Sequence, residues 1–223
     1  MASGPKQTLF AELARIAHAL GHAHRLGILE QVAQGERTVE VLALASGLSV
    51  ANASQHLKLL RSAGLVASRR VGKFVRYRLA DDSVLDLMAA LRRTAERNSA
   101  EVGCVLREYF WQRDNMEAVS RTELQERIDL GLVTVLDVRP HDEFVLGHLP
   151  GSLNVPLDEL EARLSALDPA QEIVAYCRGA YCVLSFDAVA RLRALGFNAR
   201  RLEDGYPEWR AAGLPCEECE AHD

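Results

Sequence analysis

The sequence predicts two domains, a mainly α-helical domain that ends in a β-hairpin and a small α/β domain built on a parallel sheet. A chain of 223 residues is long enough for both. Its hydrophobic period changes from helical spacing to alternation, and then to short apolar runs between helical segments. The charge divides too: residues 1–115 carry 16 Lys and Arg against 11 Asp and Glu, whereas residues 116–223 carry 10 against 20. The basic half is therefore the one expected to bind phosphate.

Composition excludes several classes of protein. Hydrophobic residues make up 48% of the chain and charged residues 26%, which excludes a disordered, collagen-like or membrane-spanning chain. The first apolar stretch contains Glu12, Arg15 and His18, so it lacks the uncharged core of a secretory signal. Five cysteines, an odd number, do not fit a secreted disulfide framework. We expect a cytoplasmic protein with no membrane partner.

Three helices are predicted near the amino terminus from apolar residues at helical spacing. Gly35 and Gly47 end the second and third helices, and Thr38 is expected to cap the third. The residues expected to face inward are Leu9, Leu13, Ile16 and Leu20 in the first helix, Leu26, Leu29 and Val32 in the second, and Val41, Leu42 and Ala45 in the third.

A fourth helix and a hairpin follow. Ser49 can cap a helix over residues 50–62, whose apolar stripe is Val50, Ala53, Leu57 and Leu60. Residues 65–70 and 74–79 alternate in hydrophobicity around a glycine turn, which is typical of a β-hairpin. A long helix is expected over about 82–112. Elements in this order make a winged helix-turn-helix, with the fourth helix as its recognition helix.

The polar face of the recognition helix and the hairpin indicate binding to double-stranded operator DNA. Asn52 and Gln55 can pair with adenine edges in the major groove, and Lys58 and Arg61 suit phosphates. The cations of the hairpin fit a wing beside a DNA backbone, although a solvated basic surface is the alternative. The residues expected to bind DNA are Ser49, Asn52, Ser54, Gln55, His56, Lys58, Arg61, Arg69, Arg70, Lys73, Arg76 and Arg78.

Three sets of motifs in this half are Ala19-Leu20-Gly21 with Arg25–Leu29, Ser54–Leu60 followed by Ala63–Val66, and Gly72-Lys73 with Tyr77–Leu79. On these motifs the chain resembles the ArsR-type winged-helix repressors over roughly residues 8–113. The resemblance implies a homodimer formed through the helices of this domain. Such a dimer would sit on a palindromic operator and repress until an inducer loosens it.

The usual metal sites of that family have no counterpart in the sequence. Residues 38–45 contain no cysteine and residues 82–113 contain no histidine, whereas zinc and arsenic sites need several converging ligands. The histidines near the amino terminus, His18, His22 and His24, are more typical of a surface or core than of a ligand set. We therefore predict no metal and no cofactor.

The second half predicts a small parallel sheet with helices on both faces. Residues 114–119 break the pattern and are expected to link the domains, and Ser120–Glu123 has capping-box spacing. The expected elements are a helix ending near Gly131, a strand at 133–138, a helix after Asp158, a strand at 172–176, a helix at 182–195 and a strand at 199–202.

A cysteine loop between Tyr176 and the next helix is the candidate reactive centre. A thiol at a helix amino terminus faces unpaired N–H groups and the positive end of the helix dipole. Both lower its pKa, as does a neighbouring arginine. We expect a catalytic role for Cys177, as a thiolate nucleophile, and for Arg178. Gly179, Ala180 and Tyr181 are expected to cradle an anion or a persulfide. An inert cysteine at the end of a buried strand is the alternative.

An ordered set of motifs runs through this half: Leu136–Arg139 with Glu143, Gly147–Pro156, the loop after Tyr176, Gly196-Phe197 and Gly205–Trp209. On these motifs the half resembles the rhodanese domain over about 120–215. The resemblance implies that Cys177 takes a sulfane sulfur from a small donor, such as thiosulfate or a persulfide, and passes it to a thiol or cyanide. Asp137, Arg139, Glu143 and His148 are expected to be framework residues rather than catalytic ones.

Four other cysteines complicate this interpretation. Cys182 stands where many rhodaneses carry a basic or hydroxyl residue, and it could be a thiol that resolves the persulfide or a packed helix residue. Cys216 and Cys219, with His222, have metal-like spacing but are expected to lie in a frayed tail. Cys104 is expected to be a buried small hydrophobe, with a regulatory role as the alternative.

The sequence therefore predicts a DNA-binding and dimerisation domain over 1–113, a linker over 114–119, a rhodanese-like domain over 120–215 and an acidic tail over 216–223. The first hypothesis is a repressor that senses reactive sulfur through Cys177. The second is a sulfurtransferase that the winged helix only localises or dimerises, which leaves enzymatic turnover open. The third is a metal-responsive repressor that uses the tail cysteines.

Overall fold

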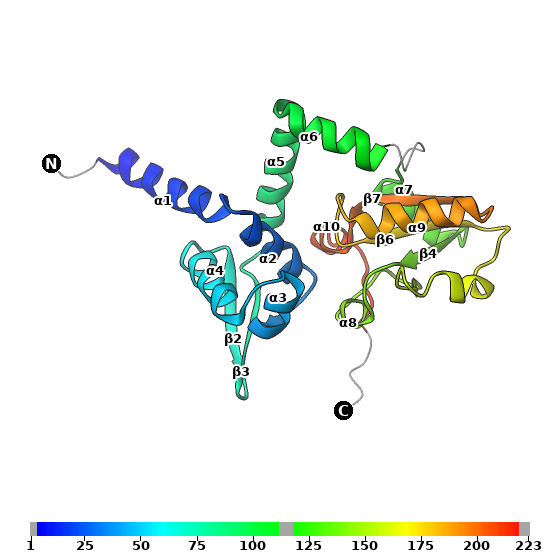
Figure 1. The fold of residues 1–223 in the computed structure, drawn as a ribbon, viewed down its shortest axis with the longest axis horizontal. Helices are drawn as coiled ribbons and strands as arrows, with labels where there is room; N and C mark the ends of the chain where they lie inside the picture. Colours follow the sequence, from blue (N-terminus) through cyan, green and yellow to red (C-terminus); the bar gives the residue numbers. More distant parts are fainter. Residues whose placement is uncertain (1–3, 112–117, 219–223) are drawn as a thin grey trace. The chain divides into compact units, whose positions relative to one another are not determined.

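The computed structural model describes residues 4–111 and 118–218 (Figure 1). Its contacts divide the chain into two compact units, Met1–Leu87 and Met88–Asp223. The division falls earlier than the expected boundary at residue 113, because Leu106 and Phe110 pack in a cluster with Phe186 of the second unit. Most of the expected linker lies outside the described residues, so its role stays a prediction.

Four helices form most of the first unit. They are α1 (Pro5–Leu20), α2 (Ala23–Ala33), α3 (Val39–Ala45) and α4 (Val50–Ser62). The hydroxyl of Ser49 accepts a hydrogen bond from the N–H of Asn52 at 3.3 Å, which confirms the predicted cap of α4. Residues fully enclosed between these helices are Ile28, Leu29, Leu42, Ala53, Leu57 and Leu60.

The predicted hairpin is confirmed. Strands β2 (Val66–Val71) and β3 (Phe74–Leu79) pair antiparallel around Gly72-Lys73, and the two-residue β1 (Arg37–Thr38) adds to β3 on its other side. Together with the four helices this makes the winged helix-turn-helix that the sequence predicts. Only the root of the hairpin enters the core, since Val66 and Leu79 are buried while Val71 and Phe74 are exposed.

Several residues predicted to face inward are exposed. Leu9 and Leu13 are 65% and 60% exposed, because the amino-terminal part of α1 extends beyond the other helices of its unit (Figure 1). In α3 the short helix is turned so that Leu42 and Ala43 face the core. The prediction that these side chains face the core is therefore wrong, in the single chain, for Leu9, Leu13, Val41, Ala45 and Val50.

The single long helix predicted over about 82–112 is interrupted, and that prediction is wrong. It consists of α5 (Ser83–Asn98), α6 (Ala100–Val105) and a π-helical segment, η1 (Leu106–Trp111). Ser99 is extended, with φ −106° and ψ 113°, and its side chain accepts a hydrogen bond from the N–H of Val102 at 3.3 Å. Serine is a preferred helix cap, so this residue starts a new helix where the periodicity indicates continuation.

The second unit contains the predicted parallel sheet. Its strands are β4 (Val133–Asp137), β5 (Leu153–Asn154), β6 (Glu172–Cys177) and β7 (Ala199–Gly205), in the order β5-β4-β6-β7. All three pairings are parallel, and β4 and β6 are the inner strands. The apolar runs Val133–Leu136 and Ile173–Ala175 are largely buried, as expected for strands covered on both faces.

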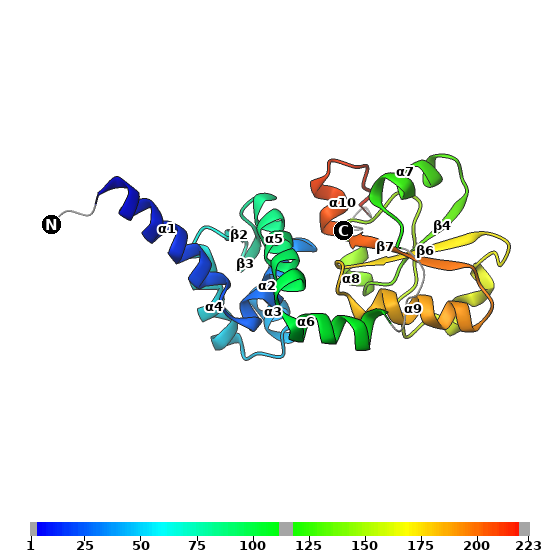
Figure 2. The same ribbon diagram turned by 90° about the horizontal axis from the view of Figure 1, so that it is seen from above.

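Helices cover both faces of this sheet (Figure 2). They are α7 (Arg121–Asp129), α8 (His141–Phe144), the 3₁₀ segment η2 (Glu161–Ala166), α9 (Val183–Ala194) and α10 (Tyr206–Ala211). Leu124 and Trp209 pack in the core on one face, and Val189 and Leu192 on the other. The helix expected after Asp158 is present as the short 3₁₀ segment η2, so that prediction is confirmed. Within the described residues, no helix is long and apolar enough to cross a membrane.

Candidate functional site

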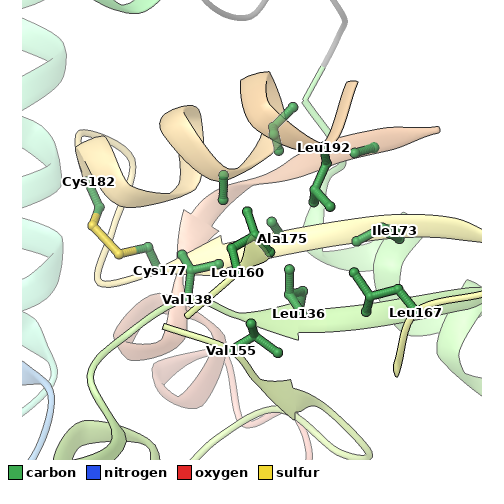
Figure 3. Packing of buried hydrophobic residues seen from close by; sticks show 13 residues of the cluster. Leu136, Val138, Val155, Leu160, Leu167, Ile173, Ala175, Cys177, Cys182 and Leu192 are labelled. Atoms are coloured by element: carbon green, nitrogen blue, oxygen red, sulfur yellow. A yellow bond between two sulfur atoms is a disulfide. The ribbon is translucent and has the colours of Figure 1, made fainter. Parts of the chain in front are cut away.

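The cysteine loop joins the end of β6 to the start of α9. Cys177 is the last residue of β6 and Cys182 is the N-cap of α9, so the loop begins at an inner strand and ends at a helix amino terminus. The two cysteines form a disulfide, with their Cα atoms 6.1 Å apart. Figure 3 shows this bond beside the first turn of α9, at one end of the cluster of buried residues.

Both sulfur-bearing residues lie in the core of the second unit. Cys177 is 1% exposed and Cys182 is 7% exposed, and both belong to the cluster that includes Val138 and Ala188. In this disulfide Cys177 has no thiolate, so the structure contains the oxidised form of the expected nucleophile rather than the nucleophile itself. The catalytic role of Cys177 and the resolving role of Cys182 stay predictions.

Gly205 forms the floor of the loop. It pairs with Cys177 across β6 and β7, and a Cβ atom at Gly205 would lie 2.3 Å from the backbone nitrogen of Gly179 and 2.4 Å from the carbonyl carbon of Arg178. Real Cβ atoms do not approach backbone atoms so closely, so only glycine fits. The sequence places Gly205 in a rhodanese motif but does not reveal this contact.

Arg178 is directed at Glu143 of α8. Its Nε lies 3.0 and 2.9 Å from the two carboxylate oxygens and its Nη2 lies 2.7 Å from Oε1. Glu143 is only 3% exposed, so the pair fixes one side of the loop to the α8 segment. This geometry favours a positioning role for Arg178, and the catalytic role that the sequence predicts for it stays a prediction.

A buried polar network supports the strand ends beside the loop. Arg139 and Asp137 are both fully buried and paired at 2.6 Å, and Arg139 also donates to the carbonyl of Gly147 at 2.8 Å. The Tyr176 hydroxyl donates to Asp137 and accepts from the N–H of Leu149. Burial raises the pKa of Tyr176 well above its ordinary value, so the phenol stays protonated. These contacts match the framework role expected for Asp137 and Arg139.

Tyr181, the last loop residue before Cys182, contacts residues of α5 within the second unit. Its hydroxyl donates to Oε1 of Glu96, and the guanidinium carbon of Arg92 lies 5.6 Å from its ring centroid. Burial raises the pKa of Tyr181, and the nearby carboxylate of Glu96 raises it further. No sequence pattern connects Tyr181 to Glu96, since 85 positions separate them.

The residues expected to bind DNA lie mostly exposed on α4 and the hairpin. Those exposed on α4 or at its cap are Ser49, Asn52, Ser54, Gln55, Lys58 and Arg61, and those exposed on the hairpin are Arg69, Arg70, Lys73 and Arg78, while His56 and Arg76 are half-buried. Glu36 pairs with Arg69 at 2.6 Å and lies 3.9 Å from Arg78. The Arg69 guanidinium lowers the pKa of Glu36. A phosphate would therefore compete with a carboxylate for Arg69, and contact with DNA stays a prediction.

Three histidine rings gather beside α4. The ring centroid of His56 lies 4.7 Å from that of His22 and 6.0 Å from that of His24. Desolvation lowers the pKa of His56, and the charges of His22, Arg25 and His24 lower it further. No sequence pattern connects His22 and His24 to the recognition helix, and the fold brings both rings beside His56. Among residues 4–111 and 118–218, no three metal-binding side chains converge as a metal site.

The remaining cysteines take different environments. Cys104 is half-buried, and its thiol donates to Oε1 of Glu108 at 3.1 Å. That carboxylate raises the pKa of Cys104, which favours the protonated thiol. Cys216 is exposed, and the next residue, Glu217, pairs through its backbone with His148, so the tail is anchored at its start. Cys219 and His222 lie outside the described residues.

The fold and the site together define a regulator-like class of protein: a winged helix-turn-helix joined to an α/β domain with a cysteine loop at a strand end. Two family models match, "Bacterial regulatory protein, arsR family" over residues 23–68 and "Rhodanese-like domain" over residues 120–212. The HTH-type transcriptional regulator Rv0324 of Mycobacterium tuberculosis is 44% identical over 216 residues, which are 97% of this chain and 95% of that protein. The chain belongs to the ArsR family of bacterial transcriptional regulators and carries a rhodanese-like domain. Both resemblances drawn from the motifs are confirmed.

Two solved structures are each similar to one part of the chain. The homodimeric winged helix-turn-helix DNA-binding domain of Mb0332 from Mycobacterium bovis, a possible ArsR-family regulator, is 39% identical. That similarity covers 45% of this chain and 94% of that chain, with a TM-score of 0.42. A rhodanese-related protein from Thermoplasma volcanium is 29% identical and covers 46% of this chain and 98% of that chain, with a TM-score of 0.42.

Proposed function

We propose that this regulator is a homodimeric repressor that senses reactive sulfur at Cys177 and converts the signal into a Cys177–Cys182 disulfide. The observation that carries the proposal is the disulfide itself, which joins the expected nucleophile to the N-cap residue of α9. The same chain carries an ArsR-type DNA-binding domain, and DNA binding by this domain is the activity that the modified loop would change.

The proposed chemistry has two balanced steps. The Cys177 thiolate attacks the sulfane sulfur of a persulfide R–S–SH, its S–S bond breaks, and R–S⁻ leaves while Cys177 becomes a persulfide. The Cys182 thiolate then attacks Sγ of Cys177, the disulfide forms, and HS⁻ leaves. The two thiols are oxidised and the sulfane sulfur is reduced to sulfide, so no further oxidant is required. With thiosulfate as the donor, sulfite leaves in the first step.

The proposed operator surface is the exposed polar face of α4 with the cations of the hairpin. Lys73 at the tip of the hairpin and Lys58 on α4 are both exposed, and the first half of the chain has a formal charge of +5. Affinity for duplex DNA is therefore expected to fall steeply with salt.

Exposed apolar residues of α1 support the proposed homodimer. Leu9, Phe10 and Leu13 are 58–65% exposed, although they lie on one helix at spacing that normally faces a core. The similar Mycobacterium bovis domain is described as homodimeric. The mass of the full chain in solution, measured by light scattering, tests this assembly directly.

The proposal is tested on wild type, Cys177→Ser and Cys182→Ser after treatment with polysulfide or thiosulfate. Mass spectrometry is expected to find the disulfide in wild type and one added sulfur on Cys177 in Cys182→Ser. The same samples are then titrated with a duplex from the protein's own promoter region. We expect treatment to change the DNA affinity of wild type, in which Cys177 is modified, and to leave the DNA affinity of Cys177→Ser unchanged. Identical affinities for treated and untreated wild type and Cys177→Ser would overturn sulfur sensing.

A sulfurtransferase enzyme is the second candidate, and the rhodanese-like match favours it. Cys182 competes with it, because a thiol that can bond to Cys177 would consume the persulfide before an external acceptor arrives. We expect Cys182→Ser to transfer more sulfur from thiosulfate to cyanide than wild type does. Robust turnover by wild type, together with no salt-sensitive binding to promoter DNA, would favour the enzyme. Stoichiometric binding of zinc or arsenite would instead favour the metal-responsive repressor.

A further inference from the structure

We propose that Tyr181 and Glu96 form the contact through which the state of the Cys177–Cys182 loop acts on helix α5. Tyr181 is the direct neighbour of Cys182, and its hydroxyl donates to Oε1 of Glu96. Its ring lies 5.8 Å from that of Phe110 and packs beside the cluster of Leu106, Phe110 and Phe186. This inference rests on the proposed function and names the route of its regulation.

A second residue of α5 attaches to the floor of the same loop. Arg92 lies 3.9 Å from Oδ1 of Asp204 and 4.0 Å from Oε1 of Glu208. Glu208 in turn accepts from the N–H of Gly205 at 3.2 Å. Arg92 and Glu96 are four residues apart and so lie on one face of the helix. One face of α5 therefore contacts both the end of the loop, at Tyr181, and its floor, beside Gly205.

The electrostatics of this contact favour a specific arrangement. The Tyr181 phenol is protonated, since its pKa is raised, and it donates to a carboxylate. Hydrogen bonds to charged groups are stronger than neutral ones. The Arg92 guanidinium lies over the Tyr181 ring, where the negative face of the ring attracts a cation. A shift of Tyr181 would weaken both interactions at once.

Helix α5 belongs to both units of the chain. It begins at Ser83, shortly after the hairpin strand β3, and Val84 and Leu85 are buried in the first unit. Its residues from Met88 onward belong to the second unit. The helix is one uninterrupted element from Ser83 to Asn98, so a change at Glu96 and Arg92 acts on an element that also carries residues of the first unit.

The conformation of the loop depends on its redox state because the disulfide restrains it. The bond connects Cys177 to the residue next to Tyr181, and opening it to two thiols, or to a Cys177 persulfide, removes that restraint. Coupling requires that the closed and open loops interact differently with α5. In the closed loop Tyr181 holds Glu96 and Arg92, and in the open loop it releases them. Tyr181 is thus a positioning residue that acts through its hydroxyl and its ring, whereas the cradle expected of the loop consists of backbone N–H groups.

The test compares Tyr181→Phe and Glu96→Gln with wild type in the full-length protein. Each is treated with polysulfide, and the extent of Cys177–Cys182 disulfide formation is measured by mass spectrometry. The measured quantity is the ratio of promoter-DNA affinities between the oxidised and reduced forms. We expect disulfide formation as in wild type in Glu96→Gln, and in both variants a ratio about tenfold closer to one, or at one where the wild-type response is smaller. Tyr109→Phe is the matched control, since it removes a tyrosine hydroxyl from η1 outside the loop.

The outcomes separate this inference from the proposed function. Failure of wild type to change its DNA affinity on oxidation would overturn both. A wild-type response that persists unchanged in Tyr181→Phe and Glu96→Gln would overturn only the coupling contact. Glu96→Gln lies far from the cysteines in sequence, so it decides the question even where Tyr181→Phe alters disulfide formation. A merely structural role would lower the DNA affinity of the reduced form or the unfolding temperature, and both are expected to stay at wild-type values.

Discussion

The close approach of Gly205 to the loop backbone makes Gly205→Ala a sensitive test of how the cysteine loop is built. The new Cβ would lie 2.3 Å from the nitrogen of Gly179, whereas contacts below 3.0 Å essentially never occur. Because the neighbour is backbone rather than a flexible side chain, the loop must move by about 1 Å. Overpacking of this kind costs about 1–3 kcal/mol.

That cost corresponds to a fall of about 4–24 °C in the unfolding temperature of a domain of this size, at roughly 4–8 °C for each kcal/mol. Displacement of Arg178 and Gly179 should also slow disulfide formation, because both lie between the two cysteines. The assay is thermal unfolding of the full-length protein, combined with the rate of thiol loss during polysulfide treatment.

Gly179→Ala is the matched control. A Cβ at Gly179 would lie 3.7 Å from Oε1 of Glu208, which is an ordinary van der Waals contact, so its unfolding temperature should stay near that of wild type. Wild-type stability and wild-type oxidation in Gly205→Ala would refute the reasoning. Equal damage in both variants would show that the loop resists any added side chain, rather than one at its floor.

Three further changes test other parts of the molecule. Asp137→Ala leaves the fully buried Arg139 without its carboxylate, and should lower the free energy of unfolding by about 3–5 kcal/mol in chemical denaturation. Glu159→Ala breaks the exposed pair with Arg163 and should change the free energy of unfolding little. Similar losses of stability in Asp137→Ala and Glu159→Ala would contradict the burial argument. Glu36→Gln releases Arg69 for phosphate and should raise DNA affinity and steepen its salt dependence by about one unit of slope, while an unchanged slope would mean that Arg69 does not reach DNA. The pKa of His56 is lowered in the folded state, so the unfolded chain takes up the proton first as pH falls through about 6.5. Stability should therefore decline between pH 7.5 and 5.5, and less so in His56→Gln, which circular dichroism at each pH can measure.

Much of the fold could be predicted from local patterns. The hairpin follows from alternation around Gly72-Lys73, and the start of α4 follows from Ser49, because both depend on residues close in sequence. The strands β4 and β6 follow from their buried apolar runs. The interruption at Ser99 could not be predicted, since a serine is compatible with a helix interior and only its local conformation shows that it caps a new helix.

The position of the cysteine loop between a strand and a helix was predictable, but its surroundings were not. Cys177 and Cys182 stand out through the loop between a strand and a helix, and the pairing of the two was one of two open interpretations. The contacts of Gly205 under the loop, of Glu96 with Tyr181 and of His56 with His22 join residues distant in sequence. The exposure of Leu9 and Leu13 likewise depends on which chain covers α1, which their helical spacing does not encode.

The burial of the Cys177–Cys182 disulfide has a kinetic consequence. At 1% exposure for Cys177 and 7% for Cys182, a protein reductant such as a dithiol cannot reach either sulfur atom until the loop opens. Once the reductant is abundant, adding more should not accelerate recovery, because the opening step becomes rate-limiting. The lifetime of the oxidised regulator would then be set by the opening of its own loop. The disulfide form would therefore persist in the cell after a brief exposure to reactive sulfur had ended.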